Sequence, residues 1–321
     1  MQGHDALSGA RSMAASFDVV GLGLNAVDQL VTVRRYPVLG GKERILASQT
    51  LPGGQVSSAM VGAQRLGLRA RYVGAVGDDA AGTVLVESLR AEGVDARHVT
   101  VVPGAHTQSG LIVVDEESGE RTVFWEHDER LRLPATSVSA DVIADARILH
   151  VDGFDTEAAV RAAEIARAQG IIVTSDLDSA YPGIDELLPL LDYLMVAEDL
   201  APILAGRAGD DHERAVRTLA ERHGCCAVVT LGARGALACA GGELVVSPAF
   251  RPPRTEDTTG AGDAFRAGFI YGIAHGLPLE ETLRCANAVA SLSCRALGAR
   301  AGMPHEDELR RFLAVAEPLT A

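Results

Sequence analysis

Residues 257–263 have the sequence Asp-Thr-Thr-Gly-Ala-Gly-Asp, and the apolar stretch that follows predicts a helix over residues 261–275. Gly260, Ala261 and Gly262 are too small to cover the backbone where this helix begins. Their N–H groups therefore point outward, and the helix dipole adds partial positive charge at the same place. Such a loop predicts a site for a transferring phosphoryl group that requires no Lys or Arg.

Asp263 lies in the first turn of the predicted helix, directly after the small residues. A carboxylate at this position can accept the proton of a hydroxyl group that attacks the phosphoryl group. For an isolated Gly-Ala-Gly, a plain glycine-rich turn with a helix-terminal charge would be the better interpretation. The complete run, with an acid at each end, instead favours Asp263 as the catalytic base.

Around this loop the chain alternates short β-branched runs with longer amphipathic stretches. Such alternation predicts a mostly parallel sheet with helices on both faces. Two further pairs of strand-like runs have no helix between them and predict a small β lid, with strands from about residues 27–51 and 106–126. We expect a single α/β domain over residues 17–316, preceded by a disordered extension over residues 1–16.

The elements expected outside the lid follow from this alternation. The expected strands are residues 17–21, 71–76, 148–151, 171–175, 193–196, 227–231, 236–240 and 244–247, and the expected helices are residues 55–66, 81–91, 156–169, 201–204, 212–223, 261–275, 279–296 and 306–316.

Composition limits the classes of partner. The formal net charge of −14 argues against nucleic acid or an anionic membrane as the main partner. Five cysteines occur without a C-x-x-C pair, which predicts reduced thiols rather than a disulfide framework or a zinc site. Because no signal-peptide-like segment and no run of 18 apolar residues is present, we expect a cytoplasmic protein.

Residues 21–26 formally match G-x-G-x-x-A, the fingerprint of dinucleotide-binding proteins. That fingerprint requires a helix directly after the glycines. The residues that follow, 27–33, are rich in Val and read as a strand. The match is therefore rejected as a nicotinamide-dinucleotide site.

With the remaining motifs in view, the chain resembles the PfkB (ribokinase-like) carbohydrate kinases. Residues 257–263 resemble the second signature of that family, and residues 53–82, beginning Gly-Gly-Gln, resemble the first. The resemblance extends over residues 17–304. It implies a ribokinase-like three-layer α/β/α fold with a mostly parallel sheet and a small β-strand lid, and it implies transfer of phosphate from ATP with Mg²⁺ to a small sugar-like molecule.

The resemblance also assigns roles to the residues of the loop. It implies that Asp263 is the catalytic base and that the Gly260–Gly262 segment is the anion hole. Asp257 and the carbonyl of Thr259 fall where many family members bind a monovalent cation such as K⁺. We therefore expect Asp257 and Thr259 to hold a cation.

Substrate contacts are expected from the first half of the chain. Gly53 and Gly54 precede a helix and allow close approach of a ligand to the backbone, so they would line the sugar site. The resemblance places Asn25 and Asp28 at the end of the first strand, where Asp28 can bind two hydroxyl groups of a polyol. Many members carry Asn in the following helix where this chain has Ser58, and we expect Ser58 to face the substrate.

Two more residues are candidates for substrate contact. Gln108 begins the second lid hairpin, and Asp152 ends a predicted strand. A purely structural role is the alternative for each of them. Trp125, the single tryptophan, is better explained by lid packing or a dimer contact than by sugar stacking.

The nucleotide is expected against the second half of the chain. Residues 230–235 read Thr-Leu-Gly-Ala-Arg-Gly and resemble the T-L-G-x-x-G turn of the family, so Thr230, Gly232 and Gly235 are expected to contact ATP. Asn287 falls where family members border the adenine.

One element of the family is missing. Its Asn-x-x-Glu motif, which helps to organise Mg²⁺ and phosphates, should lie at residues 197–200, which read Ala-Glu-Asp-Leu. Glu198 is expected to hold Mg²⁺ through water, with a helix N-terminal acid as the alternative interpretation. Asp176 and Asp178 follow a predicted strand and are further candidates for Mg²⁺.

The acceptor is less well determined. Residues 283–290 and 300–304 resemble the ketohexokinase and sulfofructose kinase branch, which favours a ketose or an acidic ketose derivative. Ribose, fructose, 2-keto-3-deoxygluconate and nucleosides stay open. A non-catalytic sugar- or nucleotide-sensing relative is the alternative function, whereas a phosphosugar phosphatase would need an Asp-x-Asp site that is absent after the first strand. A homodimer formed through the lid is also expected.

Overall fold

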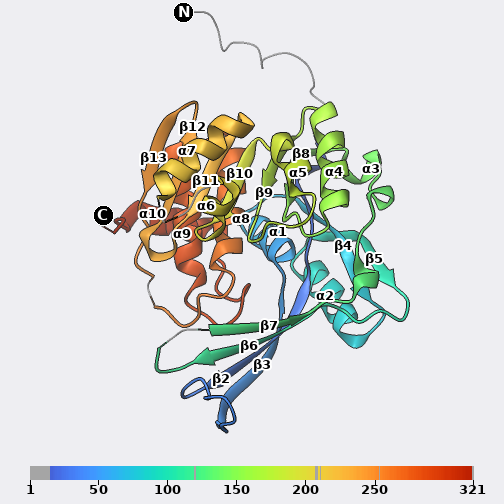
Figure 1. The fold of residues 1–321 in the computed structure, drawn as a ribbon, viewed down its shortest axis with the longest axis vertical. Helices are drawn as coiled ribbons and strands as arrows, with labels where there is room; N and C mark the ends of the chain where they lie inside the picture. The colour runs from blue at the N-terminus through green and yellow to red at the C-terminus, as the bar shows by residue number, and fades with distance from the viewer. Residues whose placement is uncertain (1–14, 119–120, 207–208, 210, 253, 320–321) are drawn as a thin grey trace, which may run out of the picture.

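The computed structural model describes residues 15–118, 121–206, 209, 211–252 and 254–319. Its main sheet has nine strands in the order β13-β12-β11-β10-β9-β8-β1-β4-β5 (Figure 1). The strands are β1 (Phe17–Leu22), β4 (Ala70–Gly77), β5 (Asp95–Val102), β8 (Ala146–Val151), β9 (Ile172–Ser175), β10 (Tyr193–Ala197), β11 (Cys226–Thr230), β12 (Ala236–Ala240) and β13 (Glu243–Ser247).

The sheet is parallel from β5 to β11, and the β11–β12 and β12–β13 pairs are antiparallel, so that β12 alone is reversed among the nine strands of this sheet. Parallel neighbours end at the same edge, so the loops after β1, β8, β9 and β10 open on one side of the molecule. β1 lies inside the sheet, third from the β5 edge, between β4 and β8, and carries the fully buried Val19 and Val20. This agrees with the continuous apolar run expected of a strand buried on both faces.

Helices form a layer on each face of the main sheet. One apolar core contains residues of α1 (Gln55–Arg65), α2 (Ala80–Ala91), α8 (Ala261–Ala274), α9 (Leu279–Ser293) and α10 (Glu306–Val315). The other contains residues of α3 (Ala140–Ile143), α4 (Thr156–Ala168), α5 (Ile184–Leu187), α6 (Leu200–Leu204) and α7 (His212–His223). Four 3₁₀ helices complete the described elements: η1 (Glu129–Leu131), η2 (Ala135–Ser137), η3 (Leu188–Leu190) and η4 (Gly232–Arg234).

Small side chains let these helices approach the sheet closely. In α4, Ala158, Ala162 and Ile165 recur at helical spacing and are at most 7% exposed. The observed arrangement is the three-layer α/β/α fold that the sequence predicts.

A second sheet of four strands, in the order β3-β2-β6-β7, projects from the end of the main sheet (Figure 1). Its strands are β2 (Ala26–Val33), β3 (Ile45–Gly53), β6 (Ser109–Asp115) and β7 (Arg121–Glu126). β2 pairs in parallel with β6, and the two outer strands pair antiparallel to their neighbours. This sheet is the predicted lid, and it is reached directly from β1 because β2 follows β1 without a helix. The dinucleotide fingerprint requires a helix directly after β1, so the strand observed there agrees with its rejection.

Some expected boundaries differ from the structure. β5 was not predicted, because Asp95, Arg97 and His98 interrupt its apolar residues, and it lies at the edge of the sheet. α9 ends at Ser293 rather than at residue 296. The expected disordered extension falls almost entirely outside the described residues.

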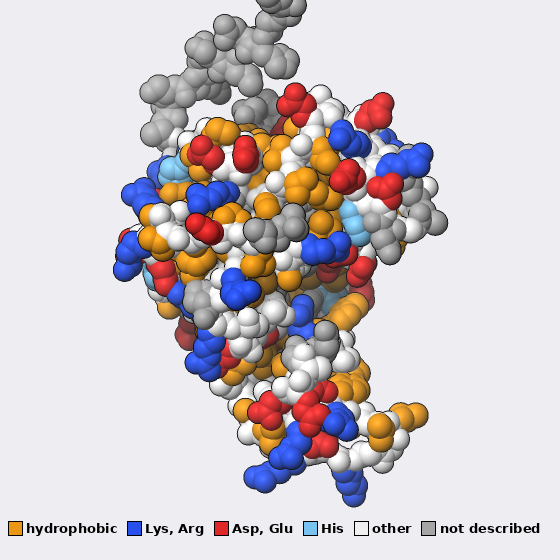
Figure 2. Space-filling view, turned by 90° about the vertical axis from the view of Figure 1, so that its left-hand side faces the viewer, with side chains coloured by type: hydrophobic (Ala, Val, Ile, Leu, Met, Phe, Trp, Pro, Cys, Tyr) orange, Lys and Arg blue, Asp and Glu red, His pale blue; other side chains and the backbone are white. Residues whose placement is uncertain are grey.

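The surface carries charges of both signs. On the face shown in Figure 2, basic and acidic side chains are interspersed, and the lid end bears both. The segments that lead out of β2 and β6 also form an exposed ion pair between Arg35 and Glu117. Among the described residues, no helix combines the length and the apolar character needed to cross a membrane.

Candidate active site

The loop before α8 is held in place by Asp257. The Asp257 side chain is 7% exposed; its Oδ1 accepts the N–H of Thr259 and its Oδ2 accepts the N–H of Gly298, each at 2.8 Å. Gly260 is the N-cap of α8 with φ +74°, and a Cβ added there would lie 2.5 Å from Cα of Ala299. Glycine is therefore required at this position both for its conformation and for the close approach of the neighbouring loop.

Two N–H groups at the start of α8 are left for a ligand. Ala261 N–H donates to Thr258 O at 3.2 Å, and Ala264 N–H donates to Gly260 O at 2.9 Å. Helix geometry gives the N–H groups between them, those of Gly262 and Asp263, no acceptor within the helix. Because Gly262 is exposed and carries no side chain, an anion can reach both groups.

This loop separates two cavities. The first, here called the lid cavity, has a volume of about 460 Å³ and is lined by Asp263, Gly260 and Thr259 together with lid residues such as Asp28 and Trp125. The second, here called the α9 cavity, has a volume of about 350 Å³. Thr258, Ala261 and Gly262 line the α9 cavity from the other side of the same loop.

Asp263 lies among charged groups. Burial raises its pKa well above the usual value, and the nearby Asp176 carboxylate raises it further, whereas Arg266 and Arg300 oppose the shift. Asp176 itself is buried and lies 2.9 Å, Oδ1 to Nε, from Arg266, whose side chain is 3% exposed. A carboxylate with a raised pKa is a stronger proton acceptor once it is ionised, as a general base requires.

Asp28 enters the lid cavity from β2 between two glycines. A Cβ at Gly53 would lie 1.9 Å from one Asp28 carboxylate oxygen, and a Cβ at Gly110 would lie 2.6 Å from the other. Burial raises the pKa of Asp28 to about 6, and the charge of Arg300 partly opposes that shift. Asp28 and Gly54 both line the lid cavity, whereas Gly53 forms the wall behind the Asp28 carboxylate.

Arg300 is a buried guanidinium that the sequence analysis did not assign to the site. It is 5% exposed, and its Nη2 donates to Asn25 Oδ1 at 3.2 Å, to Gly53 O at 2.7 Å and to Ser57 Oγ at 2.8 Å. Its Nε donates to Ser58 Oγ at 3.1 Å. Ser58 is fully buried against Arg300 and lines none of the described cavities, so the expected direct contact of Ser58 with substrate is replaced by support of Arg300.

The residues expected at the nucleotide are brought together. Thr230, Gly232, Gly235 and Asn287 all line the α9 cavity. Asn287 is 4% exposed, and its Nδ2 donates to Ser247 O at 3.0 Å and to Ser247 Oγ at 2.9 Å. The backbone turn after β11 and the amide on α9 thus face the same space.

Two of the residues expected to hold cations, Glu198 and Asp257, already have protein partners in the structure. Glu198 is ion-paired with Arg234 and lies 3.8 Å from His212 Nε2. Asp257 uses each carboxylate oxygen for a backbone N–H, as described above, and Thr259 Oγ1 has no hydrogen-bond partner. Over the described ranges, no group of three or more His, Cys, Asp or Glu side chains is arranged to hold a metal ion.

Two expected ligand-facing acids lie behind the site instead. Asp152 is 1% exposed; its Oδ2 accepts the N–H of Leu24 at 2.7 Å and its Oδ1 accepts that of Phe154 at 3.0 Å. Burial raises the pKa of Asp152 to about 8, although both N–H groups oppose the shift. Asp152 therefore joins β8 to the end of β1 and does not line the lid cavity. Asp176 is occupied by Arg266, whereas Asp178 does line the cavity and accepts the Tyr181 hydroxyl at 2.9 Å.

Gln108 lines the lid cavity, as expected. Arg121, the first residue of β7, was not among the expected site residues; it also lines the lid cavity and donates from Nη1 to Thr258 Oγ1 at 2.9 Å. This contact joins the lid to the loop before α8. Its signal in the sequence was weak, because a single Arg at the start of an exposed strand usually faces solvent.

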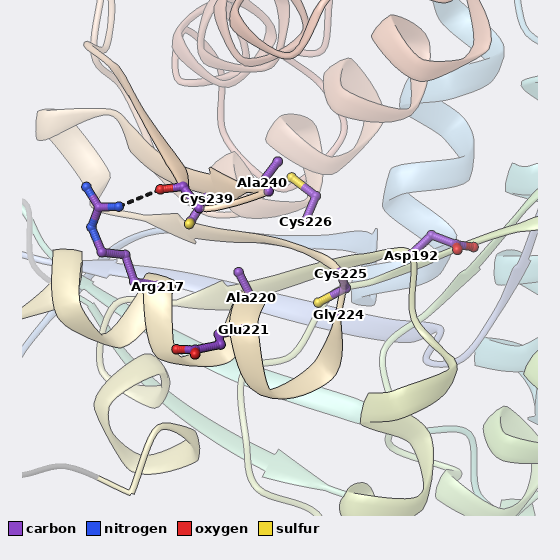
Figure 3. A pocket seen from close by; sticks show the side chains of 11 residues that line it. Asp192, Arg217, Ala220, Glu221, Gly224, Cys225, Cys226, Cys239 and Ala240 are labelled. Atoms are coloured by element: carbon purple, nitrogen blue, oxygen red, sulfur yellow. Dashed lines mark hydrogen bonds between the residues drawn. The ribbon is translucent and has the colours of Figure 1, made fainter. Parts of the chain in front are cut away.

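A third cavity, of about 740 Å³, lies between α7 and the β11–β12 strands and is lined by Cys225, Cys226 and Cys239 among others (Figure 3). Burial raises the pKa of Cys225 to about 11 and that of Cys226 to about 12, so both stay as thiols. Arg217 Nη1 already donates to Gly242 O at 2.8 Å. None of the described lining residues has a buried polar atom without a partner, and nothing there indicates a ligand.

The profile of the pfkB family carbohydrate kinases matches residues 27–306. The chain is 29% identical to the ribokinase of Bacillus subtilis, with 91% of this chain and 98% of that protein covered, and 32% identical to the fructokinase of Klebsiella pneumoniae, with 82% and 92% covered. A solved Agrobacterium tumefaciens structure, assigned as a ribokinase, is 28% identical with a TM-score of 0.85, covering 93% and 99% of the two chains.

Proposed function

The chain belongs to the PfkB family of carbohydrate kinases, and from this membership we propose that it transfers the γ-phosphoryl group of ATP to a hydroxyl of a small ketose-like polyol. The observation that carries the proposal is the loop before α8. Gly260 and Asp263 face the lid cavity, and Ala261 and Gly262 face the α9 cavity. A phosphoryl group that passes from one cavity to the other must pass the N-terminus of α8.

The proposed mechanism assigns one task to each group. The acceptor hydroxyl hydrogen-bonds to the Asp263 carboxylate, which takes its proton as the oxygen attacks the γ-phosphorus. The N–H groups of Gly262 and Asp263 stabilise the charge on the transferring phosphoryl oxygens. Asp28 binds two hydroxyl groups of the acceptor and fixes its orientation. The lid excludes water, which would otherwise compete for the phosphoryl group.

The charge of the lid cavity favours an uncharged acceptor. Asp28, Asp178 and Asp263 line it, and Arg121 is its only cationic lining residue among those described. An acidic acceptor would meet three carboxylates and one guanidinium, and like charges at close range are unfavourable. Of the two forms of ketose that the sequence favours, the neutral one is therefore our proposal. Ile112, Val123 and Trp125 would pack against its C–H groups.

Mg²⁺ is part of the proposal as the partner of ATP. Protein sites for this ion commonly supply one or two carboxylates, with phosphates and water completing its shell. Glu198 would contribute through water and would have to share its carboxylate with Arg234. The ion would neutralise phosphate charge that this acidic protein does not otherwise balance. Binding of K⁺ at Asp257 and the Thr259 carbonyl remains a separate proposal.

Two further expectations stay proposals. A homodimer through the lid is supported by the exposed apolar residues Leu111 and Phe124, which are 39% and 51% exposed and face each other across β6 and β7. A cytoplasmic location fits a kinase that uses ATP and has thiols without disulfides.

ADP formation tests the proposed function. The purified chain is incubated with ATP and Mg²⁺ and with D-fructose, D-ribose, a sugar acid or adenosine in turn. We expect ADP release that depends on a neutral sugar. A chain that binds sugar or nucleotide in calorimetry and releases no ADP with any acceptor would instead be a sensing relative of these kinases.

A further inference from the structure

A small cavity continues the lid cavity toward the main sheet. Its volume is about 10 Å³, close to that of one water-sized probe, and we call it the hinge cavity. Leu24 and Gln108 belong to the walls of both cavities. The remaining lining residues are Gly23, Asn25, Ala75, His127, Leu131 and Asp155.

Three polar atoms around the hinge cavity are buried and have no hydrogen-bond partner. They are Asn25 Nδ2, His127 Nε2 and Asp155 Oδ1. Asn25 is 3% and Asp155 is 8% exposed, so bulk water does not compensate them. Each such atom costs free energy unless a ligand or an ordered water pairs with it.

The neighbouring hydrogen bonds determine which of these atoms donates. Asn25 Oδ1 accepts from Arg300 Nη2 at 3.2 Å, which leaves the Asn25 NH₂ group as a donor for the hinge cavity. His127 Nδ1 lies 2.7 Å from Gln108 Oε1, and a carboxamide oxygen only accepts, so the proton is on Nδ1 and Nε2 is an acceptor. Burial lowers the pKa of His127 and keeps its ring neutral.

Asp155 completes the set as a second acceptor. It is the N-cap residue of α4, but its side chain makes no capping hydrogen bond. Its Oδ1 lies 3.8 Å from Arg132 Nη1, which is beyond hydrogen-bond distance. The hinge cavity thus offers one donor, from Asn25, and two acceptors, from His127 and Asp155. An anion would find two acceptors against it, and an ammonium group would meet the Asn25 donor.

We propose that the hinge cavity is a second subsite for the acceptor, which takes one uncharged hydroxyl group remote from the hydroxyl that is phosphorylated. A hydroxyl can accept from Asn25 and donate to His127 or Asp155, which matches the atoms present. The inference rests on the proposed function, since it names a further feature of the same substrate. It adds His127 and Asp155 to the residues that determine specificity.

The position of this subsite also links it to the lid. Gln108 directly precedes β6 and His127 directly follows β7, so their hydrogen bond closes the base of the lid hairpin. Asn25 directly precedes β2, the other lid strand that leaves the main domain here. A hydroxyl that accepts from Asn25 and donates to Asp155 would therefore tie the start of β2 to the start of α4, and one that donates to His127 would tie it to the end of β7.

A deoxy series on the unmodified enzyme tests the subsite. D-Fructose, D-ribose and adenosine are compared first, and the best acceptor is then compared with each of its monodeoxy analogues. We expect one analogue that still carries the phosphorylated hydroxyl to show kcat/KM lower by at least about tenfold, mainly through KM, because the buried Asn25 donor and the acceptor that the hydroxyl paired with stay unpaired. Equal kcat/KM for all such analogues would mean that the cavity holds only water and would overturn the inference while leaving the kinase function intact.

A matched pair of variants assigns the effect to the hinge cavity. His127→Phe should reduce the discrimination against that analogue to about twofold or less, His127→Gln should restore part of it, and His106→Phe, an exposed histidine outside both cavities, should leave it unchanged. Discrimination that persists in His127→Phe overturns the inference.

If His127→Phe does not fold, Asn25→Ser is measured in its place, because it alters the donor of the same cavity. If calorimetry detects none of the three acceptors and no ADP forms, the proposed function fails and the subsite with it.

Discussion

Asp263 shares a buried neighbourhood with Asp176, Arg266 and Arg300, and its proposed role depends on being the carboxylate that also faces the lid cavity. Asp176 has a guanidinium partner at 2.9 Å and no access to that cavity. Arg300 supports Asn25 and Ser58 through hydrogen bonds and lowers the pKa values of Asp28 and Asp263. In the proposed mechanism, Asp263 is therefore the one of these four residues that meets substrate, and the other three adjust its proton affinity.

Asp263→Asn should lower kcat by about 100- to 10,000-fold, because an amide cannot take the proton of the acceptor. ATP binding should persist, since the α9 cavity is unchanged. Steady-state ADP release and calorimetry with a non-hydrolysable ATP analogue measure the two effects. Asp178→Asn is the control, as it removes the same charge from the same cavity and should change kcat by less than about tenfold. Comparable loss in both variants would contradict the assignment.

Asp28 should make stability depend on pH. Its pKa in the folded protein is about 6, above the usual value of 3.8, so the folded state binds its proton more tightly than the unfolded chain does. The contribution to stability is complete below pH 3.8 and is lost as the pH rises through about 6. Asp28→Asn should therefore raise the free energy of unfolding at pH 7.5 by on the order of 2 kcal/mol and change it little near pH 4. Urea unfolding at both pH values measures this, and an equal effect at both would contradict the proposed burial cost.

At the residue scale, the loop at residues 257–263 could be predicted from the sequence, whereas the buried residues around the cavities could not. Residues 257–263 are contiguous, so their roles follow from local order. Arg300, His127 and Asp155 act beside residues that are 19 or more positions away, and nothing in their own surroundings in the sequence marks them as residues of the site. Ser58 was expected to face substrate because of its position in the helix, yet the longer Arg300 side chain fills that place.

At the scale of elements, α8 and the lid determine how the two cavities meet. α8 begins at Ala261 against the loop that contains Ala299, and the lid reaches the same region through Arg121. Both contacts lie within a few residues of Gly260. The two elements can therefore be tested separately with substitutions at either side of that loop.

Gly260→Ala should destabilise the protein by about 2–4 kcal/mol, because the new Cβ adds a clash with Ala299 to the cost of positive φ. Gly276→Ala is the matched control. Gly276 has φ +67° and no atom within 4 Å of an added Cβ, so only the conformational cost, about 1 kcal/mol, should remain. Chemical unfolding of both variants measures the difference, and equal values would argue against tight contact at Gly260.

Arg121→Ala should weaken closure of the lid. Loss of the hydrogen bond to Thr258 Oγ1 should raise KM for the acceptor by about fivefold and raise ATP hydrolysis without acceptor relative to sugar phosphorylation. Arg35→Ala, which breaks the exposed Arg35–Glu117 pair in the lid, is the control. If both variants keep the ratio of hydrolysis to transfer, Arg121 has no part in excluding water.

The elements were predicted more completely than their ends. Strand-like runs without a helix between them predicted the lid strands, and in the structure one face of that sheet lines the lid cavity while the other faces outward. β5 was missed because an edge strand tolerates charged residues such as Asp95 and Arg97. The Asn-x-x-Glu motif is missing, and Glu198, the acid found in its place, forms an ion pair with Arg234 of the expected nucleotide turn.

At the scale of the whole molecule, the lid carries a group of exposed large apolar side chains on neighbouring strands, among them Leu111, Val123, Phe124 and Trp125. Val123 and Trp125 point toward the lid cavity, so Phe124 between them points away from it, together with Leu111. A sheet face of this kind is a common site of self-association. The fold is compatible with a monomer as well as with a lid dimer, because the same lid could close over substrate in a monomer.

Phe124→Glu should convert a lid dimer into monomers, since it places a charge in the apolar centre of the proposed interface. Analytical ultracentrifugation at several concentrations measures the change. Val246→Glu on β13, which is similarly exposed at 54% but remote from the lid, should leave the sedimentation coefficient unchanged. An unmodified chain that sediments as a monomer at every concentration would exclude the dimer.

The two cavities draw on different parts of the chain. Apart from Thr259, Gly260, Asp263 and Ala299, the lid cavity is lined by residues up to position 181, whereas the α9 cavity is lined from position 230 onward. Under the proposed function, the gene therefore encodes acceptor choice and donor choice in largely separate halves. Substitutions can accumulate in the first half, and new sugars be recruited, without retuning the use of ATP. A recombination crossover between these positions would exchange one preference and inherit the other intact.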